Sequence, residues 1–184
     1  LIDNPLRSTD EILNWITKLM VKYSLTVKLI GLKHIKNWIA GGDEIKHTSG
    51  SFFQINSVQV EASTREVTRW TQPMIKSTEA GLVGFLVTEI NDTLHFLARG
   101  IVEVGNIDVI HMAPTIQCSM YKQRFSKKNK CFPYIDIFLS SPENILYDQM
   151  QSEEGGRFYY CQNRHMVVKI DDYKNLELRD DYIW

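Results

Sequence analysis

The chain has 184 residues, 43% of them hydrophobic and 23% charged, a composition typical of a globular protein with a buried apolar core. Its formal net charge of −1 gives no general electrostatic reason to expect nucleic acid or an anionic membrane as a partner. No apolar run is long enough to cross a bilayer, and no basic and apolar leader opens the chain. We therefore expect a cytoplasmic protein with no nucleic-acid partner and no membrane partner.

The three cysteines, Cys118, Cys131 and Cys161, are widely spaced and odd in number. None forms a C-x-x-C pair, and none lies near a histidine at the spacing of metal ligands. We expect reduced thiols rather than a disulfide framework, and no metal site.

The N-terminal third contains one helix signal and two strand signals. Ser8 and Glu11 have the spacing of a capping box, and apolar residues follow at helical intervals, which predicts a helix from about Thr9 to Tyr23. The β-branched stretch 26–32 and the alternating stretch 52–60 predict strands.

The middle of the chain is the region richest in strand signals. The apolar run 82–90, the turn dipeptide Asn91-Asp92 and the run 93–102 predict a hairpin. The run 108–119 predicts a further strand in which Pro114 sits at an edge, a bulge or an end.

The last third has weaker signals. Residues 133–139 predict a short helix and residues 165–170 a late strand, whereas the basic run 122–130 is either a solvated loop or a phosphate-facing one. No linker or repeat divides the chain. We expect one α+β domain over residues 1–184, with a mixed or antiparallel sheet and a core from about residue 26 to 170.

Ionisable residues interrupt the apolar pattern of the run 93–102. If this run is one strand, His95, Leu97 and Arg99 share a face. Charged groups on a central strand must be exposed or paired, because burial without a partner is costly. The strand then leads into Glu103 and Asn106, an acid and an amide on a glycine turn.

Two other segments place polar groups among apolar ones. Thr115 and Gln117 are expected on one strand face. Trp70 and Gln72 precede Pro73, so the indole either packs on the core or offers a flat face to a base or sugar, with Gln72 as its hydrogen-bonding neighbour.

The stretch 151–160, QSEEGGRFYY, is either a polar surface turn or one wall of a ligand site. Its two glycines allow positive φ and close approach of a ligand. Arg157 could clamp a phosphate or a carboxylate. Glu153 or Glu154 could act as a base, or could only neutralise Arg157 and Arg164.

Several long strings of this chain resemble, in the same order, the NDP-hexose 2,3-dehydratases of deoxysugar biosynthesis. The similarity covers about residues 26–170 and is carried by KNWI, HTSGSFFQI, REVTRWTQPMI, LHFLARGIVEVGN, APTIQC and QSEEGGRFYYCQNRHMVV. The resemblance implies a Nudix-like fold without a Nudix motif, and an enzyme that needs no metal and no other cofactor. It also implies a nucleoside-diphosphate 4-keto-6-deoxyhexose, typically dTDP-linked, as the ligand, and loss of water across C2 and C3 as the reaction.

Such a reaction needs a base, an acid, donors to an enolate oxygen and cations for the diphosphate. The catalytic candidates, in which base and acid are not distinguished, are Glu103, Glu154, His95 and Tyr121. The substrate-binding candidates are Trp70, Gln72, Arg99, Asn106, Thr115, Gln117, Glu153, Arg157 and Arg164. Glu153 is also a candidate for proton transfer.

Two departures from the family pattern leave alternatives open. Family members usually carry two such repeats in tandem, whereas this chain holds one that is most similar to the second, so it is either a natural single-repeat protein or a fragment. A single repeat could rebuild the tandem arrangement as a homodimer, which is the state we expect. Ile101 stands where the family usually has a basic residue, and Val104 where it usually has proline. The alternatives to a dehydratase are a non-catalytic nucleotide-sugar-binding domain and an isomerase or epimerase of the same 4-keto sugar.

Overall fold

The computed structural model describes residues 5–119, 133–140 and 142–184. It is an α+β structure with mixed and antiparallel sheets, as the sequence predicts. Within these residues the strands form three sheets, and no helix is long and apolar enough to cross a membrane.

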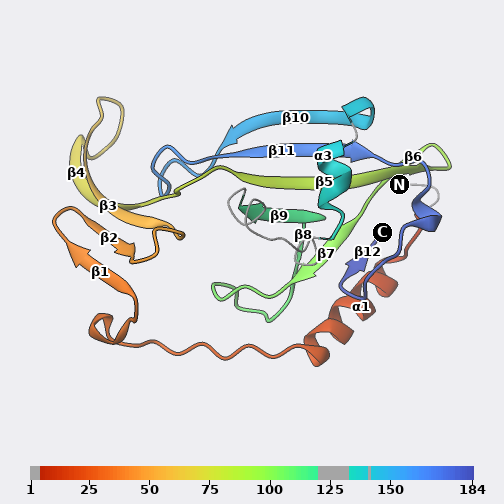
Figure 1. Cartoon of the computed structure of the whole chain (residues 1–184), viewed down its shortest axis with the longest axis horizontal. Helices are drawn as coiled ribbons and strands as arrows, with labels where there is room; N and C mark the ends of the chain where they lie inside the picture. Colours follow the sequence, from red (N-terminus) through yellow and green to blue (C-terminus); the bar gives the residue numbers. More distant parts are fainter. Residues whose placement is uncertain (1–4, 120–132, 141) are drawn as a thin grey trace.

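The first sheet is an antiparallel four-stranded sheet at one end of the molecule (Figure 1). A tight turn joins its first two strands, and Gly42 supplies the positive φ of +59° that this turn requires, whereas longer loops over 48–53 and 62–68 make the other two connections. Its strands are β1 (Trp38–Gly41), β2 (Glu44–His47), β3 (Gln54–Glu61) and β4 (Arg69–Lys76).

The second sheet is built around β5 (Gly81–Ile90), whose apolar residues are largely buried. One edge of β5 pairs in parallel with β11 (Gln162–Lys169), which pairs antiparallel with β10 (Ile145–Ser152). The other edge is shared by β9 (Ile116–Ser119) and β6 (Thr93–Phe96), each of which pairs antiparallel with part of β5.

The third sheet joins the middle of the chain to its C-terminal tail. β7 (Ala98–Ile101) pairs antiparallel with β8 (His111–Ala113) on one side and with β12 (Tyr182–Ile183) on the other. The tail beyond residue 170 therefore belongs to the folded body, and Tyr182 is part of the main hydrophobic core.

Helices cover these sheets at two places. α1 (Thr9–Lys22) begins with the predicted capping box and packs Leu19 against β7 at Gly100, where a Cβ would lie 2.5 Å from a leucine methyl group. α3 (Ile135–Ser140) places Phe138 over Gly84 of β5. Short 3₁₀ helices occur at Leu32–His34, Pro142–Asn144 and Tyr173–Asn175.

Several predicted elements are confirmed with small shifts of their ends. The helix of residues 9–23 is α1, the strand of 52–60 is β3, and the helix of 133–139 is α3. The hairpin turn at Asn91 and Asp92 is also confirmed, since both residues adopt the left-handed conformation that a tight hairpin requires, with φ of 52° and 58°.

The strand predicted for residues 26–32 is wrong. This segment runs as a single extended stretch between α1 and β1 (Figure 1) and ends in a 3₁₀ turn. A β-branched sequence favours extended backbone, but a strand forms only where a partner offers its hydrogen bonds.

The predictions of single strands over 93–102 and 108–119 are also wrong. The first run breaks at Leu97 into β6 and β7, and the second breaks at Pro114 into β8 and β9. In each case the two halves belong to different sheets, so His95 and Arg99 do not share the face of one strand.

Candidate active site

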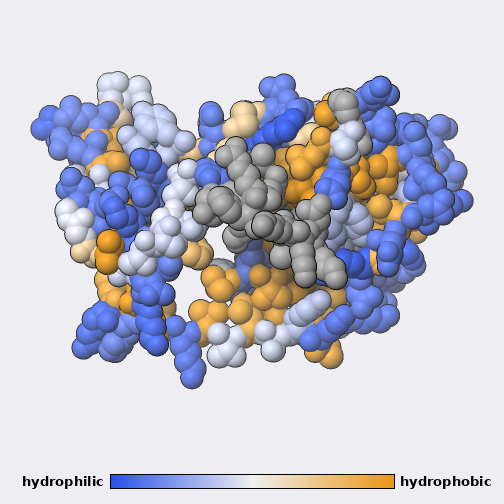
Figure 2. Space-filling model, viewed as in Figure 1, coloured by the Kyte–Doolittle hydropathy of each residue, from blue (hydrophilic) through white to orange (hydrophobic). Residues whose placement is uncertain are grey.

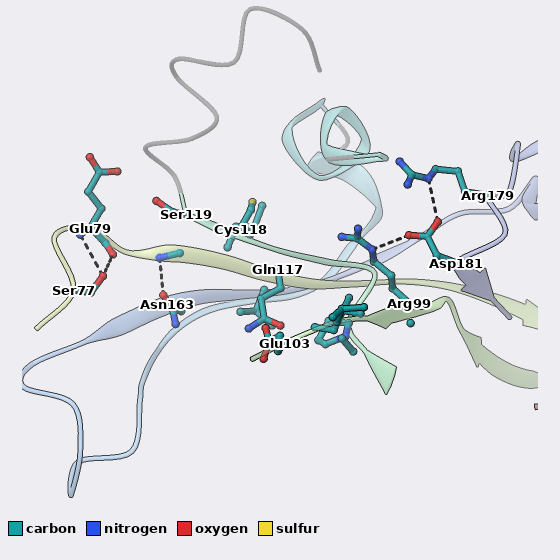
Figure 3. A pocket seen from close by; sticks show the side chains of 18 of the residues that line it. Ser77, Glu79, Arg99, Glu103, Gln117, Cys118, Ser119, Asn163, Arg179 and Asp181 are labelled. Atoms are coloured by element: carbon teal, nitrogen blue, oxygen red, sulfur yellow. Dashed lines mark hydrogen bonds and ion pairs between the residues drawn. The ribbon is translucent and has the colours of Figure 1, made fainter. Parts of the chain in front are cut away.

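A cavity with a volume of about 670 Å³ lies where the second and third sheets meet. This volume falls within the range of small-molecule sites. Its walls come from the start of β5, from β7 and the residues after it, from β9, and from the C-terminal tail. Figure 3 shows the polar side chains of this cavity, among them Glu79, Arg99, Glu103, Gln117, Asn163 and Arg179.

Glu103 and Gln117 bring an acid and an amide to this cavity. Gln117 lies on the exposed face of β9, between the buried Ile116 and Cys118. Glu103 follows β7 and begins a turn in which the Asn106 N–H donates to its carbonyl oxygen at 3.2 Å. Glu103 is exposed, so a ligand in the cavity can reach its side chain.

Two arginines share one buried carboxylate at another part of the cavity. Arg99 Nε donates to one oxygen of Asp181 at 3.2 Å, and Arg179 Nε donates to the other at 3.1 Å. Arg99 also lies over the ring of Tyr182, with 5.5 Å between the guanidinium carbon and the ring centroid. Burial raises the pKa of Tyr182 to about 12, so this phenol stays neutral at physiological pH.

The motif containing Trp70 and the motif containing Arg157 lie side by side, at a place separate from the cavity walls. Trp70 Nε1 donates to Gln72 Oε1 at 2.7 Å, and Gln72 Nε2 donates to the carbonyl of Gly156 at 2.9 Å. Arg157 and Glu154 form an exposed ion pair at 3.3 Å. Backbone hydrogen bonds from Ile75 to the loop 157–159 fix the two segments together.

Glu153 connects this loop to the cavity. Asn163 donates to the Glu153 carboxylate through its amide nitrogen and accepts from the Gly81 N–H at 2.6 Å through its oxygen. Since Asn163 and Gly81 both line the cavity, Glu153 lies just behind the wall.

Three other predicted site residues have internal partners. His95 accepts from the Leu6 N–H at 3.1 Å, and Asn106 is bonded to His111. Arg164 forms a two-armed ion pair with Asp148, at 2.7 and 2.6 Å. Its guanidinium holds the pKa of the Asp148 carboxyl below the ordinary value, chiefly through these hydrogen bonds.

Thr115 is fully buried, in contrast to Gln117. The expectation that the two lie on one strand face is wrong, because β9 begins only at Ile116. The Thr115 hydroxyl accepts from the Leu86 N–H and donates to the Leu97 carbonyl. Tyr121 lies outside the described residues.

The structure thus brings Arg99, Glu103 and Gln117 together and places Trp70, Gln72, Glu154 and Arg157 in a second group. Sequence reasoning missed Glu79, Asn163, Arg179 and Asp181 as cavity residues. The two acids and the arginine of the tail 179–181 were visible as a charge cluster, but nothing in their spacing linked them to Arg99. Within the described ranges, no group of three His, Cys, Asp or Glu side chains is placed to hold a metal ion.

Comparison with known proteins decides the family. The family model described as NDP-hexose 2,3-dehydratase matches residues 9–184. The chain belongs to this family.

Three curated relatives carry the printed name dTDP-4-dehydro-6-deoxy-alpha-D-glucopyranose 2,3-dehydratase. The protein from Streptomyces violaceoruber is 36% identical over the whole of this chain, that from Saccharopolyspora spinosa 34% over 96% of it, and that from Amycolatopsis orientalis 33% over 88%. The chain spans only 41%, 37% and 35% of the length of these relatives. Their matched part therefore corresponds to less than half of each enzyme.

Proposed function

We propose that this chain acts in a dehydratase that removes water across C2 and C3 of a nucleoside-diphosphate 4-keto-6-deoxyhexose, with a dTDP-linked sugar as the substrate. Family membership supports the reaction class. The observation that carries the proposal in the structure is the shared cavity, which combines the Glu103 carboxylate and the Gln117 amide with two guanidinium groups.

The reaction begins at C3, whose proton is acidified by the neighbouring C4 ketone. In our proposal Glu103 accepts this proton, and the electron pair moves into C4–O to form an enolate. Hydrogen-bond donors such as the Gln117 amide stabilise the developing negative charge. We assign proton abstraction to Glu103 because it lines the cavity. Glu154 and His95 lie outside the cavity and are bound to Arg157 and to the Leu6 N–H.

Collapse of the enolate then forms the C2–C3 double bond and expels the C2 hydroxyl, which leaves as water after protonation by an acid. The remaining C3 enol takes a proton at C2 and gives a 3,4-diketo-2,6-dideoxy sugar. The substrate loses one water and no electrons, so the balance requires no redox cofactor.

A purified sample incubated with dTDP-4-keto-6-deoxyglucose tests this proposal by mass spectrometry. We expect a product lighter than the substrate by one water, and a strongly reduced yield with Glu103→Gln. A wild-type sample that leaves the substrate mass unchanged contradicts the dehydratase.

One observation favours the alternative of a nucleotide-sugar-binding domain without catalysis. Ile101 and Val102 contribute apolar surface to the cavity next to Glu103, and Ile101 replaces the basic residue usual in the family. Tight binding of the sugar nucleotide without turnover would establish this alternative. Proton exchange at C3 without loss of water would instead indicate an isomerase or epimerase.

We further propose that the protein works as a homodimer. Its accessible surface is 13434 Å², whereas a compact monomer of 21.4 kDa exposes about 9,100 Å². This excess of about 4,300 Å² belongs to one chain, whereas an obligate interface buries about 2,000–5,000 Å² over both partners together, so the excess is large enough to supply one partner's share of such an interface. Figure 2 shows an opening between the four-stranded sheet and the rest of the molecule, with hydrophobic side chains along part of its edge.

The segment between α1 and β1 is the strongest candidate for this interface. Val27, Leu29, Ile30 and Leu32 are each more than half exposed, and water is an unfavourable environment for four apolar side chains in six residues. The partner that we propose for this segment is a second copy of the same chain. Analytical ultracentrifugation should give twice the chain mass, and Leu29→Ser with Leu32→Ser should shift the protein to monomer. A wild-type monomer contradicts the homodimer.

The Nudix-like relationship and the cytoplasmic location belong to the same proposal. The mixed sheet with a helix packed on β5 supports the first, and a biosynthetic sugar-nucleotide substrate supports the second. An experimental structure compared with Nudix proteins, and fractionation of the producing cells, test them.

A further inference from the structure

The paired guanidinium groups of Arg99 and Arg179 have more hydrogen-bonding capacity than their carboxylate partner uses. Each arginine donates to Asp181 through Nε alone. A guanidinium carries five N–H donors, so four on each side chain remain for other partners. Among the residues that the structure describes, neither Arg99 nor Arg179 has any other ion pair or hydrogen bond through its side chain.

The positive charge is confined to the part of the cavity around Arg99 and Arg179, because Glu79 and Glu103 also line its walls. Two cations meet one carboxylate, and the Asp181 side chain is 8% exposed while those of Arg99 and Arg179 are 24% and 49% exposed. Asp181 is thus fixed in the wall, and each of its two carboxylate oxygens accepts a hydrogen bond from one of the guanidinium groups (Figure 3). Both arginines line the cavity that also contains Glu103.

Neighbouring contacts hold the pair in place before any ligand arrives. Arg99 pairs with Tyr182 across the β7–β12 ladder, and the Gly100 N–H donates to the Asp181 carbonyl at 2.8 Å. α1 clamps the tail further, because Trp15 Nε1 donates to the Asp180 carbonyl at 3.0 Å and Lys22 binds the Asp180 carboxylate at 2.9 Å. Ordering these side chains in advance reduces the entropic cost of binding.

We infer that Arg99 and Arg179, oriented by Asp181, form the subsite for the diphosphate of the sugar nucleotide. Guanidinium groups bind phosphate oxygens through two parallel hydrogen bonds, and a pair of them suits the two phosphates of a nucleoside diphosphate. This inference rests on the proposed function for its ligand. It adds a residue from the C-terminal tail to the site and gives the Asp181 carboxylate a positioning role.

The location relative to Glu103 suits a sugar nucleotide. Arg99 and Glu103 are four residues apart on a largely extended stretch, so their Cα atoms are separated by at most about 13 Å. A hexose bridges such a distance when one end bears the diphosphate and the other faces the carboxylate. The same ligand can therefore meet the cations and the proposed base.

Binding of dTDP, thymidine and inorganic pyrophosphate, measured by isothermal titration calorimetry, tests the subsite without any turnover. Arg179→Gln should weaken dTDP and pyrophosphate about 10- to 100-fold, as expected for the loss of charge-assisted hydrogen bonds, and should leave thymidine unchanged. Arg179→Lys keeps the positive charge but loses the planar guanidinium, so its affinity for dTDP and pyrophosphate should lie between those of wild type and Arg179→Gln. Arg69→Gln, which removes an exposed arginine of the four-stranded sheet, is the matched control and should bind like wild type.

Three outcomes overturn the inference. If Arg179→Gln binds dTDP as wild type does, or loses thymidine in the same proportion, Arg179 does not contact the diphosphate. A wild-type protein that binds neither dTDP nor pyrophosphate also excludes the subsite. If dTDP binding depends on Arg179 but the 4-keto sugar is not dehydrated, the subsite stands and the proposed reaction fails.

Discussion

Thr115 offers the sharpest prediction about how the fold supports the cavity. β9 pairs with residues 81–84 of β5 and β6 with residues 87–90, so a gap opens along this edge between the two strands. The Thr115 hydroxyl fills the gap, because it accepts from the Leu86 N–H at 2.9 Å and donates to the Leu97 carbonyl. All three residues are fully buried.

Thr115→Val keeps the shape of the side chain but removes both hydrogen bonds. The Leu86 N–H and the Leu97 carbonyl are then both left without a partner, at a cost of about 1–3 kcal/mol each, and the added methyl group recovers part of this loss. We expect the free energy of unfolding to fall by about 2–4 kcal/mol. With a slope of about 2 kcal/mol per molar urea, the unfolding midpoint should drop by about 1–2 M.

Urea unfolding followed by tryptophan fluorescence measures this difference, and Thr71→Val, an exposed position on β4, is the matched control. The control should change the midpoint little. A Thr115→Val protein as stable as wild type, yet unable to bind dTDP, would refute the reasoning and return Thr115 to the ligand site.

Three further predictions concern the catalytic role of Glu103, the stability of the fold at acidic pH and the packing of the core at Gly84. Glu103→Gln should lower the rate of dehydration about 10²- to 10⁴-fold with little change in dTDP affinity, measured by product formation and calorimetry; equal rates would remove Glu103 from proton transfer. Arg164 lowers the pKa of Asp148, so the ion pair stabilises the fold above the ordinary carboxyl pKa of about 3.9 and this contribution disappears as the pH falls further. Asp148→Asn should therefore be less stable than wild type at pH 7 by up to about 1 kcal/mol and equal to it near pH 2, by urea titration at both pH values; a constant gap would disprove the linkage. Gly84→Ala should destabilise the fold by about 1–3 kcal/mol, because its Cβ would lie 2.4 Å from the Phe138 ring, and an unchanged melting curve would show that the ring moves freely.

Local signals in the sequence were sufficient where a segment forms its structure with its own neighbours. The capping box at Ser8 and Glu11 predicted the start of α1, and Asn91 with Asp92 predicted the hairpin between β5 and β6. Both signals act over a few residues, so no distant partner can override them.

The wrong strand predictions arise where a strand depends on pairing with residues distant in the sequence. Residues 26–32 have a strand-like sequence but no neighbouring strand, and the breaks at Leu97 and Pro114 arise because β5 shares one edge between β6 and β9. The β10 strand was not predicted, although it pairs with β11 over most of its length.

The residues of the candidate active site were also only partly predictable, because some of them reach the cavity through long-range strand pairing. The resemblance to the family pointed to Arg99, Glu103 and Gln117, which the fold brings to one cavity. Arg179 lies 80 residues from Arg99 and reaches the cavity only because β12 pairs with β7. No periodicity or motif in the sequence carries that information.

Proton NMR of dTDP-4-keto-6-deoxyglucose with the purified protein in deuterated buffer tests the central claim most directly. We predict that the wild-type protein eliminates the C2 hydroxyl and incorporates deuterium at C2 of the product, whereas Glu103→Gln neither eliminates water nor exchanges the C3 proton. The matched variant Glu154→Gln, altered at an exposed ion pair outside the cavity, should retain both activities. A substrate that keeps its C2 hydroxyl and its C3 proton in the presence of the wild-type protein, while saturation transfer shows the nucleotide bound, would contradict the account and establish a binding domain instead.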